Sequence, residues 1–225
     1  MKVMVAIPCH DKVDAVFMRS VLGLQLEGHV EFSFAIGSLV YDARNRLALQ
    51  ACQQGFDAVL WLDSDMVYPP DMFVKLCKRI EEGAEYVSAL AFTRKTPCKP
   101  VIYEYIGWRG TLPVCESMFD YPEDTIFEIA GSGMGCVMMT TGLLERVGRK
   151  FGNPFSPRMG FGEDLTFCLN VQDIGIPMFC DSSIKVGHLG YVEFNEEQYK
   201  VERSLHENET SKKRPVDLSN KGGER

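Results

Sequence analysis

The chain has 225 residues, of which 45% are hydrophobic, and this length and apolar content predict one compact domain with a sizeable core. The formal net charge of -7 argues against a broad surface for nucleic acid or anionic membranes, although a local basic groove is compatible with it. No apolar run approaches the roughly 18 residues that a membrane-spanning helix needs. Residues 1–8 hold too short an apolar core for a signal peptide, so we expect neither a signal peptide nor a transmembrane segment.

The cysteines indicate a reducing environment. All eight are scattered along the chain, and no two of them form a Cys-x-x-Cys pair. Several fall inside apolar runs, as Cys77, Cys136 and Cys168 do. This distribution predicts reduced core residues rather than a zinc site or a disulfide framework. We therefore expect a cytoplasmic protein.

The first half of the chain alternates between short apolar runs and amphipathic stretches, which predicts strands and helices in turn. We expect strands at 3–7, 31–36, 58–62 and 86–92, and helices at 12–26, 43–54 and 69–82. Asp42 is expected to cap the second helix. The order is typical of an α/β fold with a mostly parallel, Rossmann-like sheet and helices on both faces. Ligands bind such sheets at the carboxyl ends of the strands, which places 8–11 and 63–65 at one edge.

The second half is less regular and predicts a short antiparallel subregion. We expect strands at 100–105, 125–129, 136–139 and 178–180, and helices at 142–147 and 163–174. The stretch 148–162 is rich in glycine and proline, so we expect it to be ordered only in part or by a ligand. His188 is expected in a loop. From residue 196 onward the chain is polar, which predicts a tail that is disordered at least in part.

Two aspartates follow the third predicted strand, where its apolar run ends. Asp63 and Asp65 are two positions apart, so they project to the same side of an extended chain. Paired carboxylate oxygens at a strand end suit Mg²⁺ or Mn²⁺, and such cations usually accompany a diphosphate. The alternative is that Asp63-Ser64-Asp65 caps the next helix and faces water.

Five stretches, taken together and in this order, resemble the motifs of nucleotide-sugar glycosyltransferases with the GT-A fold, close to the family 2 group. They are Val5-Ala6-Ile7-Pro8, Asp42-Ala43-Arg44-Asn45-Arg46-Leu47, Leu60-Trp61-Leu62-Asp63-Ser64-Asp65, Gly162-Glu163-Asp164-Leu165-Thr166-Phe167 and His188. The resemblance spans residues 1–190. It implies a catalytic domain over 1–195, with a nucleotide-binding half at 1–95 and an acceptor half at 96–195, followed by the polar tail.

The resemblance also implies an activity. A sugar would move from a nucleotide-diphosphate-sugar donor to an acceptor hydroxyl, with inversion at the sugar and with a divalent metal. Asp63 would contact the ribose or base of the donor, and Asp65 would bind the metal that bridges the diphosphate. Pro8, Arg44 and Ser64 fall within the donor-binding motifs. For Arg44 the alternative is a plain surface arginine.

His188 matches the late histidine that completes the metal shell in many members of the family. A neutral imidazole suits Mn²⁺ better than Mg²⁺, so the resemblance favours manganese, held by Asp65, His188 and Asp63. The alternative for His188 is a solvated loop histidine that binds nothing.

Glu163 and Asp164 match the acceptor-side motif of inverting members. There the aspartate takes the proton from the acceptor hydroxyl, so Asp164 would be the general base and Glu163 would hydrogen-bond the acceptor. A base of ordinary carboxylate pKa serves when proton removal lags behind departure of the leaving group. The alternative is structural, because two carboxylates are also favourable beside a helix N-terminus.

Other readings of the sequence stay open. The Gln-x-x-Arg-Trp motif of processive polysaccharide synthases is absent, which favours a single transfer. A nucleotidyltransferase would share the acidic metal site but would usually carry a basic, glycine-rich loop after the first strand, where 8–11 has none. A non-catalytic nucleotide- or glycan-binding module is the third reading. The acceptor, the donor base and the oligomeric state are not determined by the sequence.

Overall fold

The structure, a computed structural model, describes residues 1–190 except 96, 110–111 and 159. The predicted tail from residue 196 lies outside the described residues, and the domain boundaries stay a prediction. No helix in the described part of the chain is long and apolar enough to cross a membrane. All eight cysteines fall within it as free thiols; Cys136, Cys168 and Cys180 are buried as core residues, whereas Cys98 is exposed. The cytoplasmic location stays a prediction.

Helices and strands alternate along the first half, as the apolar periodicity predicts. The helices are α1 (Ala15–Leu22), α2 (Val40–Gln53), α3 (Met72–Glu81), α4 (Thr141–Phe151) and α5 (Glu163–Gln172). The strands of the main sheet are β1 (Lys2–Cys9), β2 (His29–Ile36), β3 (Ala58–Leu62), β5 (Tyr86–Leu90), β8 (Ile126–Ile129), β10 (Cys136–Thr140) and β11 (Met178–Lys185). The other strands are β4 (Met66–Val67), β6 (Ile102–Arg109), β7 (Leu112–Ser117), β9 (Gly131–Ser132) and β12 (Gly187–His188).

The main sheet has the strand order β2-β1-β3-β10-β5-β11-β8. β1 pairs in parallel with β2 and β3, and β11 with β5, whereas β10 and β8 run antiparallel to their neighbours. Every residue of β3 and of β5 is buried, as expected for strands that are covered on both faces. The predicted mostly parallel α/β sheet is confirmed.

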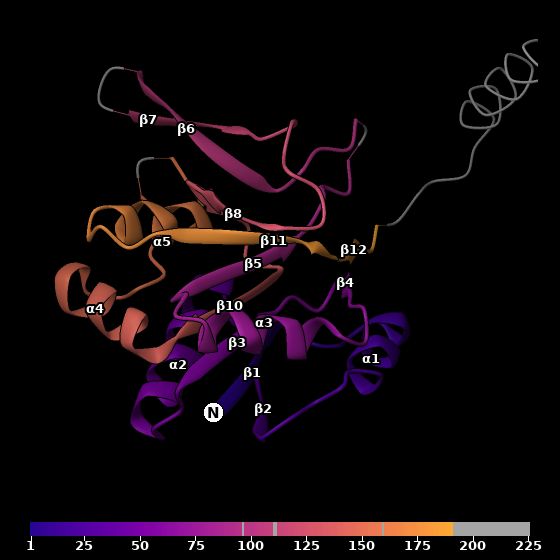
Figure 1. The fold of residues 1–225 in the computed structure, drawn as a ribbon. Coiled ribbons are helices and arrows are strands. Elements are labelled where there is room, and N and C mark those ends of the chain that lie inside the picture. Colours follow the sequence, from indigo (N-terminus) through magenta and orange to yellow (C-terminus); the bar gives the residue numbers. More distant parts are fainter. Residues whose placement is uncertain (96, 110–111, 159, 191–225) are drawn as a thin grey trace, which may run out of the picture. The chain divides into compact units, whose positions relative to one another are not determined.

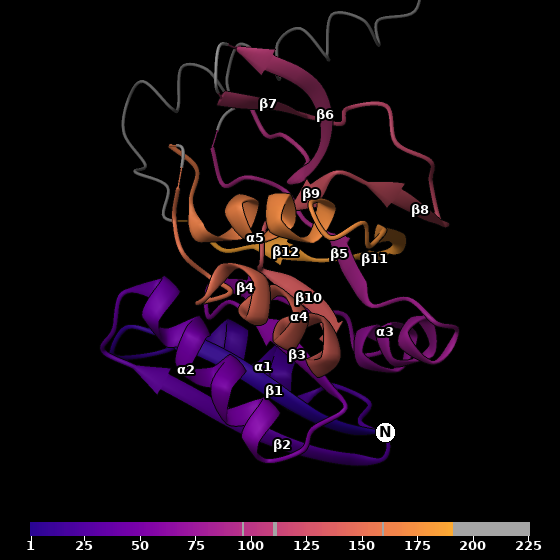
Figure 2. The same cartoon turned by 90° about the vertical axis from the view of Figure 1, so that its left-hand side faces the viewer.

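Helices cover both faces of this sheet. α2, α4 and α5 pack on one face and bring Leu47, Leu143 and Phe167 into its core. α1 and α3 pack on the other face with Phe17 and Phe73. Figures 1 and 2 show α2 and α4 on the same side of the sheet, with α1 across from them in Figure 1. Because α2 and α5 share a face, side chains from the two halves of the chain can meet there.

Three predicted helix starts are wrong by three residues each, and a side-chain cap explains the first. α1 begins at Ala15 rather than at residue 12, because the Asp14 carboxylate accepts a hydrogen bond from the backbone N–H of Val16 and caps the helix. α2 begins at Val40, so the predicted cap Asp42 lies inside its first turn. A carboxylate is favourable there because of the helix dipole. α3 begins at Met72 rather than at residue 69.

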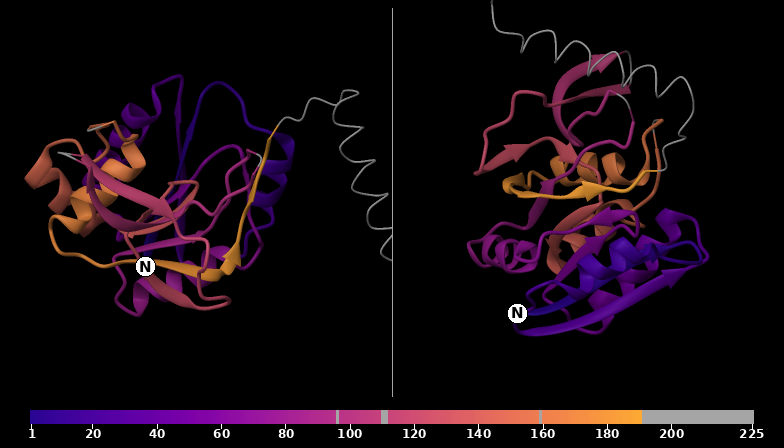
Figure 3. Two further views of the ribbon diagram at one scale, coloured as in Figure 1. Left: turned by 90° about the horizontal axis from the view of Figure 1, so that it is seen from above. Right: turned by 90° about the vertical axis from the view of Figure 1, so that its right-hand side faces the viewer.

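The second half contains more strand than the sequence predicts. β6 and β7 form an antiparallel hairpin that joins β9 in a separate three-stranded sheet, and neither β7 nor β9 is predicted. Figures 1 and 3 show this hairpin at the end of the described region opposite β2. The predicted antiparallel subregion is therefore present, and it is larger than expected.

The stretch 148–162 is more ordered than expected, although residue 159 lies outside the described residues. Phe155 is fully buried, stacks on Phe167 with 4.8 Å between ring centroids, and meets Trp61 edge-on at 5.1 Å. The side-chain amide of Asn45 donates to the carbonyl oxygen of Phe155 at 2.7 Å and accepts from its N–H at 2.9 Å. A buried ring and two hydrogen bonds thus fix this segment against β3, α2 and α5.

Candidate active site

The turn that carries the two aspartates is held by backbone contacts at the end of β3. The N–H of Asp63 donates to the carbonyl oxygen of Gly135 at 3.2 Å. The buried Tyr68 hydroxyl lies 2.9 Å from the carbonyl oxygen of Asp63 and 2.8 Å from that of Gly135, and its single proton can serve either. Tyr68 is missed by the sequence patterns. It fixes the backbone of the turn, and the side chains of the two aspartates are half-buried.

Arg44 brings the donor and acceptor motifs together. Its Nη2 donates to Oδ1 of Asp63 at 2.8 Å, and its Nε donates to Oε1 of Glu163 at 3.3 Å. The Arg44 side chain is only 3% exposed, against 30% for Asp63 and 14% for Glu163. The alternative of a surface arginine is thereby excluded. Burial opposes the charged guanidinium, but the two carboxylates outweigh it and raise the Arg44 pKa above its ordinary value, so the cation persists.

Asp164 follows Glu163 at the start of α5. Burial raises its pKa above the ordinary carboxylate value; Glu163 adds to the rise, while the Leu165 N–H, 2.7 Å from Oδ1, and Arg44 oppose it. This differs from the ordinary pKa considered above, and it makes the carboxylate a stronger base. A Cβ atom at Gly162 would lie 2.9 Å from Oδ1 of Asp164, so glycine leaves room for this side chain.

His188 does not lie in a loop, contrary to the sequence-based expectation. It belongs to β12, which pairs antiparallel with β4, so it lies opposite Met66. Its Nε2 is 3.3 Å from Oδ2 of Asp65, and its Nδ1 is 2.9 Å from the carbonyl oxygen of Phe92. That carbonyl oxygen can only accept, so Nδ1 carries the hydrogen of this bond. In a neutral ring, Nε2 would then offer its lone pair to a cation held beside Asp65.

A second arginine meets the turn at Asp65. Nη1 of Arg94, a residue between β5 and β6, donates to Oδ2 of Asp65 at 2.7 Å, and the arginine side chain is 51% exposed. The sequence patterns do not single out Arg94. Asp65 therefore lies between a histidine and a guanidinium, whereas Asp63 faces Arg44.

The residues present fit a divalent cation at Asp65. A carboxylate oxygen and an imidazole lone pair are ligands that Mn²⁺ accepts, and the Nδ1–H bond to Phe92 orients the ring as it commonly does in metal sites. Among the residues that the structure describes, no group of three or more His, Cys, Asp or Glu side chains is close enough to hold a metal. Asp65 and His188 would supply two ligands, and the remaining positions would need substrate or water. Asp63 as a ligand stays a prediction.

Pro8 and Ser64 are the remaining residues that the sequence assigns to the donor site. Pro8 is buried in β1, two residues beyond Ala6, which pairs with Trp61, so it lies alongside the end of β3. Ser64 is half-buried between the two aspartates. Their predicted roles in donor binding stay predictions.

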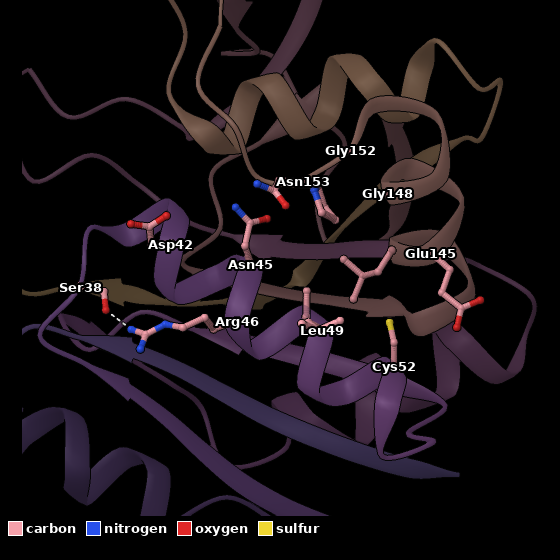
Figure 4. A pocket seen from close by; sticks show the side chains of 13 residues that line it. Ser38, Asp42, Asn45, Arg46, Leu49, Cys52, Glu145, Gly148, Gly152 and Asn153 are labelled. Carbon is pink, nitrogen blue, oxygen red and sulfur yellow. Dashed lines mark hydrogen bonds between the residues drawn. The ribbon is translucent and has the colours of Figure 1, made fainter.

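A separate cavity of about 670 Å³ lies between α2 and α4. Figure 4 shows Asn45, Arg46 and Leu49 of α2 along it, with Glu145 of α4 opposite. Arg46 hydrogen-bonds Ser38 here, on another side of α2 from Arg44 and its carboxylates. None of the predicted site residues lines this cavity.

Comparison with known proteins adds a fold-level result. No protein-family model and no curated protein matches the sequence. Among solved structures, A197 from STIV matches with 18% sequence identity over 86% of this chain and 87% of that chain, at a TM-score of 0.59. The glycosyltransferase GalNAc-T7, solved with UDP, GalNAc and Mn²⁺, matches with 12% identity over 86% of this chain and 44% of that chain, at a TM-score of 0.63.

The chain has a GT-A-like fold. The fold class expected from the sequence is thus confirmed. Identities this low show the fold alone, so the narrower likeness to the family 2 group stays a prediction. GT-A-like folds place ligands at the strand ends, where the two arginine contacts described above are found.

Proposed function

We propose that the chain is a metal-dependent glycosyltransferase that moves a sugar from a nucleotide-diphosphate-sugar donor to an acceptor hydroxyl, with inversion. The observation that carries the proposal is the contact of Arg44 with both Asp63 and Glu163. This contact joins the expected donor motif and the expected acceptor motif at one edge of the sheet. Arg44 and Glu163 lie 119 residues apart in the sequence. The GT-A-like fold supports it, as does a neighbour that was solved with UDP, GalNAc and Mn²⁺.

On the donor side, Asp63 would orient the nucleoside, with Pro8, Ser64 and Arg44 around it. Asp65 and His188 would hold the cation. When bound, a divalent cation neutralises charge on the departing nucleoside diphosphate. Mn²⁺ suits this mixed oxygen and nitrogen ligand set, and Mg²⁺ is the alternative.

On the acceptor side, Asp164 would accept the proton of the attacking hydroxyl. Its raised pKa increases its strength as a base. Gly162 and Gly133 beside it carry no side chain that would crowd its carboxylate. Glu163 shares one oxygen with Arg44, so it would hydrogen-bond the acceptor through the other. The structure gives no observation that favours a nucleotidyltransferase or an idle binding module over this reading.

Donor hydrolysis tests the proposal without knowledge of the acceptor. The purified chain is incubated with UDP-, GDP- and dTDP-sugars, with Mn²⁺ or with a chelator, and released nucleoside diphosphate is measured. We expect Mn²⁺-stimulated release from one of these donors, and loss of both release and Mn²⁺ binding in Asp65→Ala. If no donor is bound or cleaved under any metal condition, the proposal is wrong.

A further inference from the structure

Among the described residues, Arg44 is the cation that contacts both the donor side of the site, at Asp63, and the acceptor side, at Glu163. Its guanidinium bonds Asp63 through Nη2 and Glu163 through Nε. The carbon at its centre lies 5.8 Å from the ring centroid of Trp61, a cation–π distance. Trp61 is itself fully buried in β3. The guanidinium is thus held on several sides and has little freedom to leave this position.

The remaining donor of Arg44 has no partner. Nη1 is buried and makes no hydrogen bond. A donor diphosphate that used Arg44 in the expected way would have to reach a fully buried nitrogen, or displace Asp63 or Glu163 from the other two. Keeping a buried donor unpaired is unfavourable, but the same guanidinium fixes two carboxylates. This arrangement favours a role for Arg44 between the carboxylates.

We propose that Arg44 is a positioning residue that couples the two sides of the site. Because one buried guanidinium holds both Asp63 and Glu163, a change at the donor motif alters the position and the field at Asp164. The catalytic meaning of this coupling rests on the proposed glycosyl transfer. The coupling itself is a property of the protein and can be measured without substrate.

The groups that face Asp164 show why Arg44 has this influence. Besides Glu163, they are Tyr86 on β5, Tyr103 on β6 and Cys168 on α5. Burial raises the pKa of both tyrosines, and it raises the pKa of Cys168 to about 12, so all three stay uncharged near neutral pH. Among these described neighbours, Arg44 is the one that lowers the Asp164 pKa through positive charge.

The test follows the titration of Asp164 in the protein without substrate. Aspartate labelled with ¹³C at Cγ is titrated by NMR, and Asp164→Asn assigns the signal. We expect Arg44→Gln to shift the Asp164 titration to higher pH and Arg44→Lys to restore most of it, because lysine keeps the charge. Arg46→Gln, on the same helix but at the separate cavity, is the matched control and should shift nothing.

Coupling is measured by a double-mutant cycle. Asp63→Asn should shift the Asp164 titration to lower pH, and this shift should shrink when Arg44→Gln is also present. An unchanged Asp164 titration in Arg44→Gln, or an Asp63→Asn shift of the same size in both backgrounds, would overturn the inference. If Arg44→Gln does not fold, Glu163→Ala takes its place, because it breaks the contact of Arg44 on the acceptor side, and the Asp63→Asn shift should shrink in that background.

The kinetic arm separates this inference from the proposed function. With an active donor, Arg44→Lys should lower kcat by about 100-fold, as misplaced catalytic groups do, and move the acid limb of its pH profile little. A chain that cleaves no donor contradicts the glycosyltransferase proposal, while the titration still decides the coupling. A chain that transfers sugar normally in Arg44→Lys and Arg44→Gln contradicts the coupling alone.

Discussion

An arginine meets each aspartate of the 63–65 turn, but the two ion pairs lie in different surroundings. Arg44 is 3% exposed and serves two carboxylates, whereas Arg94 is 51% exposed and serves Asp65 beside His188. A buried charge without a partner is strongly destabilising. Exposed ion pairs are screened by water and salt and exchange their partners readily. The Arg44 contacts are thus a permanent part of the protein, and the Arg94 contact is one that a cation or substrate can replace.

This difference is consistent with the separate roles proposed for two residues that lie two positions apart in the sequence. Asp63 is committed to the interior through Arg44, so it can act as a fixed reference for the nucleoside. Asp65 keeps an exchangeable partner, which is what a residue that binds and releases a metal requires. The two aspartates of one short motif therefore face different partners, which supports the separate roles proposed for them.

The largest effect is expected at Asp164, which follows Glu163, one of the two partners of the buried Arg44. Asp164→Asn should lower sugar transfer by about 10²–10⁴-fold, because an amide cannot take the hydroxyl proton. Donor and Mn²⁺ affinity should stay close to the wild-type values, since Asp65 and His188 are untouched. Transfer rates and calorimetric donor binding are compared with those of Asp173→Asn, a carboxylate change at the far end of α5. Full turnover in Asp164→Asn would remove Asp164 as the base.

The two ion pairs should differ in how much each contributes to the free energy of unfolding, and removal of each arginine should show this difference. Arg44→Gln should lower the free energy of unfolding by about 3 kcal/mol, near the low end for a broken buried pair because Asp63 keeps 30% exposure. Arg94→Gln should lower it by less than about 1 kcal/mol, because exposed pairs contribute little. Denaturant unfolding measures both values. Equal losses in the two variants would mean that burial does not distinguish the pairs.

Much of this arrangement is predictable from local sequence. The apolar run 58–62 followed by two aspartates gave the bounds of β3 correctly, because a continuous buried run needs no distant partner to be recognised. The expected start of α5 at Glu163 is also correct. The expected starts of α1, α2 and α3 are wrong, because an apolar stripe does not mark where the first turn of a helix begins; of these three helices, only α1 has a side-chain cap.

The burial of Arg44 has a signal in the sequence. The buried positions of α2 are Ala43, Arg44, Leu47, Ala48 and Ala51. An arginine inside such an apolar stripe requires a buried partner, and that partner must come from elsewhere in the chain. The signal predicts that carboxylates meet Arg44, but it cannot say that they are Asp63 and Glu163. Contacts such as Arg94 with Asp65 have no local signal at all.

The raised pKa of Asp164 predicts that the charged form of this buried carboxyl lowers the free energy of unfolding. A carboxyl whose pKa is higher in the folded than in the unfolded state binds more protons when folded, so stability falls as pH rises through the window between the two values. Asp164→Asn carries no such penalty. It should therefore be more stable than wild type at neutral pH, by less than the loss in Arg44→Gln, and this advantage should vanish below the ordinary carboxylate pKa of about 4. Unfolding free energies at the two pH values measure it.

The smallest effect belongs to the exposed pair. Since Arg94 and a divalent cation would compete for the Asp65 carboxylate, Arg94→Gln should raise Mn²⁺ affinity by about 1.4- to fivefold, the equivalent of the roughly 0.2–1 kcal/mol typical of exposed ion pairs. High salt screens that pair and should reduce the gain. Electron paramagnetic resonance of free Mn²⁺ measures the affinity, with Lys95→Gln as the control for a neighbouring charge on the same segment. Weaker Mn²⁺ binding in Arg94→Gln would show that Arg94 supports the metal site, and the division into a permanent and an exchangeable pair would then be wrong.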